Sequence, residues 1–116
     1  MFRSIPLKFQ FGESIHAVDS PNFSQSLRAE LWVQQEAFVP IAMKLGGGYL
    51  DGGIEFRIDR VEVRELEIRL ITTLYFNVFQ DPGCGTPDRS FGASIRLELL
   101  IATDTGSVTA CTPIDG

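Results

Sequence analysis

The chain has 116 residues and a formal net charge of −5, from 15 acidic and 10 basic side chains. The length suits a single domain over residues 1–116, and 44% hydrophobic against 22% charged residues is a globular composition that excludes a disordered chain. The basic residues stand among acidic ones, so no strongly positive surface is expected. Nucleic acid is therefore not an expected partner.

No stretch approaches the roughly 18 to 20 continuous apolar residues of a membrane span, and the first eleven residues lack the apolar run of a signal peptide. We therefore expect no membrane association and a cytoplasmic location. The two cysteines, Cys84 and Cys111, have no zinc-binding spacing and form no disulfide framework. With a single histidine in the chain, we expect neither a metal site nor a cofactor.

Apolar and polar residues alternate from Phe2 to Phe11, which predicts a strand. Because Pro6 has no N–H to donate, this strand is expected at a sheet edge. The next element is ambiguous. Ser20-Pro21 is typical of a helix start, and apolar residues at steps of three and four predict one helix from about Pro21 to Ala42. The alternative is a strand over 20–33, where apolar residues also alternate, and the sequence leaves both open.

Pro40 is expected to end or kink that helix, and the glycines at 46–48 are expected to finish it. From Ile54 to Phe79 apolar and charged residues alternate almost without a break, which predicts strands with one buried face. The alternation changes phase near Asp59-Arg60 and near Arg64-Glu65, where a bulge or a tight turn must absorb the change. The side chains predicted to point into the core are Leu66, Ile68, Leu70, Leu74 and Phe76.

Residues 80–89 are predicted to form a loop, followed by a strand over 95–101 and a returning strand over 107–112. Asp104-Thr105-Gly106 predicts the hairpin turn between them, with glycine in a left-handed conformation. Together the elements predict an α+β fold, a curved antiparallel β-sheet of about five to six strands on one helix, as in hot-dog or cystatin-like rolls. An all-β sandwich or barrel is the alternative. This analogy of topology implies no function.

Two residues are the candidates for catalysis. His16 lies near Asp19 just before the expected helix start, where a histidine with neighbouring carboxylates can act as a general acid or base. No sequence motif around them specifies an enzyme family. In hot-dog enzymes the catalytic groups lie near the central helix, so an enzyme of this type acting on an acyl thioester is one functional alternative.

Three aromatic residues, Trp32, Tyr49 and Tyr75, are the candidates for ligand binding. Tyr49 lies within the glycine-rich run over residues 46–53, which lacks the Lys-Ser/Thr of a phosphate-binding loop and is predicted to be a connector or a flap over a ligand. Residues 74–79 make a strand that is apolar on both faces and needs a second cover. A homodimer, a ligand or covering loops would each supply that cover.

The leading hypothesis is a non-catalytic binding module for an apolar small molecule or a protein partner. The alternatives are the hot-dog-type enzyme, with His16 or Asp19 as acid or base, and an acidic inhibitor or immunity-type protein that blocks a basic partner. A deep apolar cavity beside His16 or Asp19 would favour the enzyme. A filled core with a flat acidic surface would favour the inhibitor.

Overall fold

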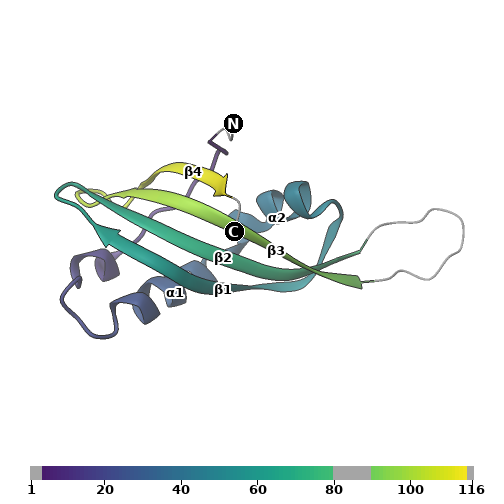
Figure 1. Cartoon of the computed structure of the whole chain (residues 1–116), viewed down its shortest axis with the longest axis horizontal. Coiled ribbons are helices and arrows are strands. Elements are labelled where there is room, and N and C mark those ends of the chain that lie inside the picture. Colours follow the sequence, from purple (N-terminus) through teal and green to yellow (C-terminus); the bar gives the residue numbers. More distant parts are fainter. Residues whose placement is uncertain (1–3, 80–89, 115–116) are drawn as a thin grey trace, which may run out of the picture.

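The structure is a computed structural model that describes residues 4–79 and 90–114. Four strands, β1 (Tyr49–Val63), β2 (Glu67–Phe79), β3 (Ser90–Ala102) and β4 (Val108–Ile114), form one antiparallel sheet in the order β1-β2-β3-β4. Figure 1 shows this meander, in which each strand pairs with its neighbour in sequence. The predicted α+β fold with an antiparallel sheet is confirmed, but the sheet has four strands instead of five to six.

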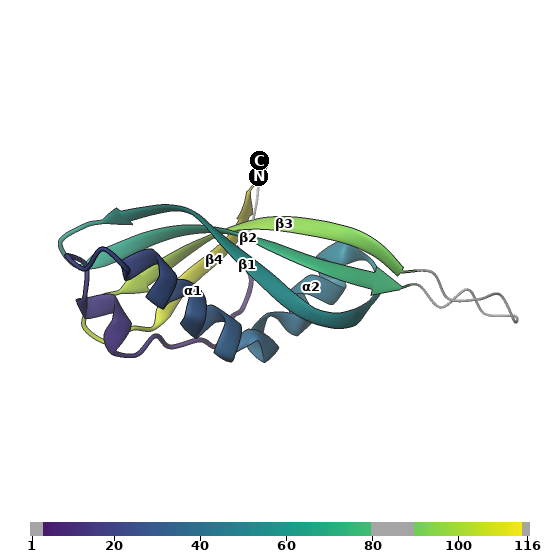
Figure 2. The same cartoon turned by 90° about the horizontal axis from the view of Figure 1, so that it is seen from below.

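Two helices, α1 (Phe23–Val33) and α2 (Val39–Gly46), lie on one side of the curved sheet (Figure 2). Residues 20–33 are therefore mainly helical, and the extended alternative is wrong. A 3₁₀ turn, Gln35–Phe38, separates the helices, so the single predicted helix is two. Pro40 lies in the first turn of α2, where its missing N–H leaves no helical bond unmade. Gly47, with φ 77°, follows the last residue of α2 in the left-handed conformation, so α2 ends at the glycine run as predicted.

The N-terminal segment is not the fifth strand that its alternation predicts. It follows β4 and makes isolated bonds: the N–H of Ile5 donates to the Cys111 carbonyl (2.6 Å), and that of Val108 donates to the Phe9 carbonyl (3.1 Å). One bridge, Gln10 to Ser107, is the only ladder pairing described for the segment. Pro6 has no N–H, so a continuous ladder cannot form here. The segment nevertheless covers the edge of β4 and buries Phe9.

The hydrophobic core lies between the helices and the inner face of the sheet. Alternate residues of β2 and β3 point inward in register, as in the pairs Leu70 with Leu99 and Ile68 with Ile101. The one buried hydroxyl deep in this face, Thr72, donates to the Arg57 carbonyl (2.8 Å). Further core side chains come from the helices and β1: Leu27, Leu31, Phe38, Ile41, Ala42, Ile54 and Phe56.

Both predicted phase changes correspond to irregularities of the sheet. The β1–β2 pairing shifts by one residue between Ile58 and Arg60, which is the bulge expected near Asp59. The second change falls in the turn between β1 and β2. Leu66 lies in this turn and is 76% exposed, so its predicted place in the core is wrong. Ile68, Leu70, Leu74 and Phe76 are buried as predicted.

Cys111 is buried on β4, and desolvation raises the pKa of its thiol to about 12, so it behaves as a small apolar side chain. Cys84 and the predicted loop 80–89 lie outside the described residues. Among the helices that the structure describes, none is long and apolar enough to cross a membrane.

Candidate functional site

The two residues predicted to be catalytic lie in exposed positions at the start of the chain. His16 ends a 3₁₀ turn, Glu13–His16, and Asp19 follows in the next turn, before α1 begins. Neither lines the three cavities along β1 that are described below, nor a fourth cavity between the N-terminal segment and β4. Over residues 4–79 and 90–114 the structure also holds no group of three or more His, Cys, Asp or Glu side chains that could bind a metal ion.

A different place in the fold is hollowed, at a wide interruption of the β1–β2 ladder. Asp51 pairs with Asn77 and Glu55 pairs with Tyr75, so residues 52–54 of β1 stand opposite the single residue 76 of β2. Gly52 adopts φ +88° at this point, a conformation that other residues rarely adopt. The interruption opens a cavity of about 570 Å³, which we call the bulge cavity.

Gln35, which follows α1, holds the interruption in place. Its Oε1 accepts a hydrogen bond from the N–H of Ile54 (2.9 Å), and its Nε2 donates to the Trp32 carbonyl (3.0 Å). A Cβ atom at Gly53 would lie 3.0 Å from the same Oε1 atom, so the close approach favours glycine. The side chain of Gln35 thereby satisfies a backbone N–H that the broken ladder leaves without a strand partner.

The bulge cavity brings two of the three predicted ligand-binding residues together. Trp32 is 56% exposed and Tyr75 is 39% exposed, and both line the cavity. Exposed tryptophan and tyrosine side chains beside a concavity are typical of binding sites, because they offer large apolar area with a polar edge. Tyr49 does not line it and instead packs on Phe79, with ring centroids 5.8 Å apart.

Polar groups complete the lining of the bulge cavity. Two of them are the carboxylates of Asp51 and Glu55, and two are the neutral polar side chains of Asn77 and Ser94. The sequence predicts none of these four as a site residue. The nearest signal in the sequence is the pair of adjacent glycines at 52 and 53, since adjacent glycines inside a strand are a known sign of a bulge.

The bulge cavity continues along the outer edge of β1 as two further cavities of about 430 and 400 Å³. All three share Glu55, and the two smaller ones share Gln25 and Arg28 of α1. We call the three together the β1 groove. Within this groove a backbone group on the outer edge of β1 is already hydrogen-bonded, since Arg28 Nε donates to the Phe56 carbonyl (2.7 Å). Such coverage by side chains protects an edge strand from unspecific strand pairing.

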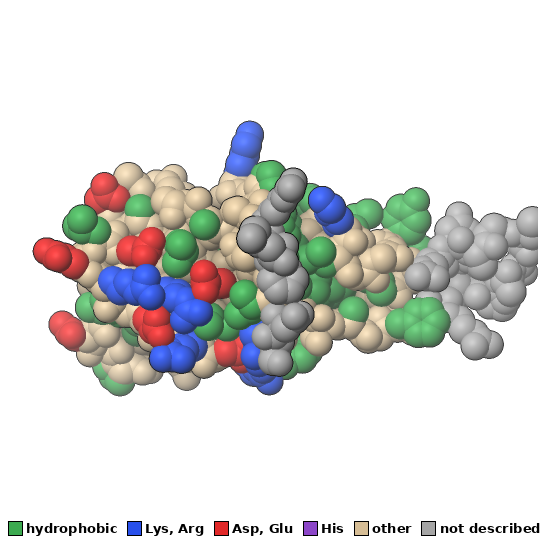
Figure 3. Space-filling view, turned by 45° about the horizontal axis from the view of Figure 1, so that its top comes forward, with side chains coloured by type: hydrophobic (Ala, Val, Ile, Leu, Met, Phe, Trp, Pro, Cys, Tyr) green, Lys and Arg blue, Asp and Glu red, His purple; other side chains and the backbone are tan. Residues whose placement is uncertain are grey.

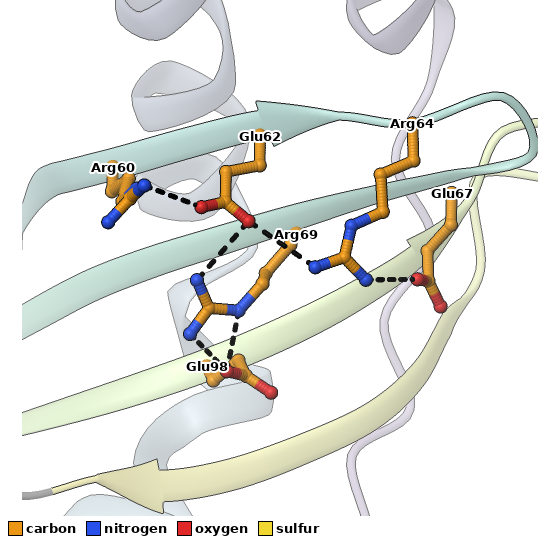
Figure 4. A network of polar contacts seen from close by, with 6 residues as sticks. All are labelled: Arg60, Glu62, Arg64, Glu67, Arg69 and Glu98. Atoms are coloured by element: carbon orange, nitrogen blue, oxygen red, sulfur yellow. Dashed lines mark hydrogen bonds and ion pairs between the residues drawn. The ribbon is translucent and has the colours of Figure 1, made fainter.

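In Figure 3 the acidic and basic side chains visible on the outer face of the sheet lie among one another, whereas the inhibitor alternative requires an extended acidic surface. Near the β1–β2 turn, Glu62 Oε2 lies 3.3 Å from Arg69, and Glu98 lies 2.7 Å from the same guanidinium. Figure 4 shows this network, in which three arginines and three glutamates balance: Arg60, Glu62, Arg64, Glu67, Arg69 and Glu98.

A second group of charges surrounds Asp59, whose side chain is 15% exposed. Its carboxylate accepts hydrogen bonds from Thr73 Oγ1 and from Arg57 Nε (2.6 Å), and Arg96 Nε lies 3.4 Å away. Burial raises the pKa of this carboxyl, but the hydrogen bonds and the two guanidinium charges outweigh it, so the pKa lies below its usual value of 3.8. The bulge at Asp59 therefore places a carboxylate where ion pairing stabilises its charged form.

Replacing Asp59 with asparagine is expected to lower the free energy of unfolding at pH 7 by about 1 to 2 kcal/mol, since two guanidinium groups lose their partner. A depressed pKa stabilises the fold fully above about pH 4, and the effect fades as the pH falls through the folded-state value. The difference between wild type and Asp59→Asn should therefore shrink at pH 3, as urea unfolding at pH 7, 5 and 3 can measure. A difference that is constant over this range would contradict the assignment.

Comparison of the chain with protein-family models, with curated proteins and with solved structures finds no match. The function therefore has to be argued from the site itself.

Proposed function

We propose that the chain is a non-catalytic binding module that holds an extended segment of a protein partner in the β1 groove. One observation carries this proposal: Trp32, which is more than half exposed, lines the cavity at which the pairing between the edge strand β1 and its neighbour β2 is interrupted. A groove between an edge strand and a helix is a recurring place for peptides to dock. Aromatic anchors of this kind supply much of the affinity of protein interfaces.

Two observations support a protein partner over the other functions considered. The core between sheet and helices is filled by fully buried side chains, and the cavities open to solvent along β1, which suits a surface segment better than an enclosed apolar molecule. His16 and Asp19 line none of these cavities, which favours binding over hydrolysis of a thioester.

The curvature of the sheet over α1 and α2 is compatible with a hot-dog or cystatin-like roll, and that assignment stays a proposal. A cytoplasmic location also stays a prediction. The homodimer also stays a prediction, and it is based on the strand 74–79, whose sequence is apolar on both faces. Sedimentation at increasing protein concentration measures its presence directly.

Selection from a library of random peptides tests the proposal. Peptides that bind the wild-type protein are expected to lose at least about tenfold in affinity for Trp32→Ala, since an interface tryptophan commonly contributes more than 1.4 kcal/mol. Val33→Ala is the matched control, because Val33 is the next residue of α1, is 73% exposed and lines none of the described cavities. Its affinities should equal those of the wild type.

Two results would count against the binding module. One is a selection that enriches no peptide. The other is a set of peptides that bind Trp32→Ala as tightly as they bind the wild type. Both variants are expected to unfold within about 1 kcal/mol of the wild type, since the replaced side chains are exposed, and urea unfolding checks this.

A further inference from the structure

We infer that the bulge cavity takes a basic side chain, arginine or lysine, of the partner's extended segment. This inference rests on the proposed function and specifies the chemistry of the bound residue. The positive group would lie against the carboxylates of Asp51 and Glu55 and beside the ring of Trp32.

The charges of the cavity lining have one sign. Among residues 4–79 and 90–114, Asp51 and Glu55 are the only charged residues that line the bulge cavity, and no lysine, arginine or histidine of these ranges lines it. The Asp51 side chain makes no hydrogen bond or ion pair with any residue that the structure describes. Glu55 meets Arg28 at 3.6 Å through side chains that are 71% and 56% exposed. An exposed pair at this distance is weak, so Glu55 is available to an incoming cation.

The aromatic lining suits the same chemistry. A cation near the face of a tryptophan or tyrosine ring is attracted by its negative π face. Tyr75 already makes such a cation–π contact within the protein, because the guanidinium carbon of Arg57 lies 5.4 Å from the centroid of its ring. Trp32 has no comparable cation among the described residues, and its ring is the larger and more exposed of the two.

The shape of the β1 groove explains how a side chain would reach this cavity. An extended segment places alternate side chains on the same side, so a segment lying along β1 can direct one side chain into the bulge cavity. The edge groups at Ile54 N–H and the Phe56 carbonyl are already bonded to Gln35 and Arg28. Recognition would therefore depend on side chains more than on a new backbone ladder.

Matched tripeptides test the inference: acetyl-Val-Arg-Val-amide and acetyl-Val-citrulline-Val-amide. Citrulline has nearly the shape of arginine and no charge. Because the chain contains one tryptophan, fluorescence excited at the long-wavelength edge of the indole absorption, where its two tyrosines do not absorb, reports on Trp32 alone. The arginine peptide is expected to bind about fivefold to tenfold more tightly than the citrulline peptide, as the combined effect of two carboxylates and one ring.

Two charge-matched double variants separate the cavity from the general negative charge of the protein. Asp51→Asn with Glu55→Gln should abolish the preference for arginine. Glu13→Gln with Glu36→Gln removes the same net charge at exposed residues that line none of the described cavities, and should leave the preference intact. Circular dichroism of both variants should match that of the wild type.

If both peptides change the Trp32 fluorescence and bind equally tightly, the inference of a basic side chain in the bulge cavity is wrong. The proposed function as a binding module would not be affected by that result. No binding of either peptide would also overturn the inference, and the library selection would then decide the proposed function separately. The inference would also be wrong if the preference for the arginine peptide persisted in Asp51→Asn with Glu55→Gln. It would be wrong as well if Glu13→Gln with Glu36→Gln removed the preference to the same extent, since the attraction would then be unspecific.

Discussion

Replacing Gly106 with alanine is expected to lower the free energy of unfolding by about 3 to 5 kcal/mol, as the sum of a strained backbone and a steric clash. Gly106 adopts φ +77°, and a Cβ atom there would lie 2.2 Å from the carbonyl oxygen of Phe11. That segment cannot move freely, because the N–H of Phe11 donates to the Gly106 carbonyl (2.7 Å) and its ring is buried in the core. Urea unfolding measures the loss.

Gly47→Ala is the matched control for this prediction. Gly47 has the same φ of +77°, but a Cβ atom there would meet nothing within 4 Å. Its substitution should therefore cost only the left-handed strain, about 1 to 2 kcal/mol. Equal losses for the two variants would contradict the close packing of the N-terminal segment on the β3–β4 turn.

Replacing Phe38 with alanine is expected to lower the free energy of unfolding by about 3 to 5 kcal/mol, through lost burial and an unfilled cavity. Phe38 is fully buried between the helices and the sheet. Its ring meets that of Phe56 edge-on at 5.1 Å and that of Phe9 at 5.5 Å, so it joins three parts of the chain.

The control for this second prediction is Phe91→Ala, which removes the same side chain from a position that is 54% exposed. Its cost should be about 1 kcal/mol or less, since most of that ring already contacts water. Thermal or urea unfolding of both variants provides the comparison. Similar losses would mean that the core is not centred on Phe38.

The strands were the most predictable part of the fold, because a period of two records directly which side chains are buried. The two phase changes even located the bulge at Asp59 and the β1–β2 turn. The predicted burial of Leu66 is wrong because this apolar residue continues the alternation of β2 by one step although it lies in the β1–β2 turn, outside the strand. The N-terminal segment was misplaced similarly, since its alternation reflects burial of Phe9 and Phe11 without a continuous ladder.

The split of the helix was less predictable. The predicted end or kink does not lie at Pro40, because proline is tolerated in a first helical turn as well as after a last one and its presence does not reveal on which side the break lies. The break falls before it, in the 3₁₀ turn Gln35–Phe38, and there Gln35 becomes available to bond the interrupted strand.

The candidate site was only partly predictable. The sequence predicts Trp32 and Tyr75 as aromatic contacts, yet their meeting at one cavity depends on the path of β1 across the end of α1, which no local pattern records. Gly52 and Gly53 carry the local sign of a bulge, whereas the glycine-rich run to which they belong predicts a connector or a flap. The prediction of His16 and Asp19 rests on their chemistry alone, and neither residue lines the described cavities.

Chemical-shift mapping of the ¹⁵N-labelled protein with a peptide selected from the library tests the central claim most directly. If the β1 groove is the binding site, the shifts should change at the Trp32 indole, at residues 52–55 and at Asn77, while those of the N-terminal turn stay constant. Changes that centre on His16 and Asp19 instead, or that are spread evenly over the chain, would contradict the assignment of the groove as the binding site.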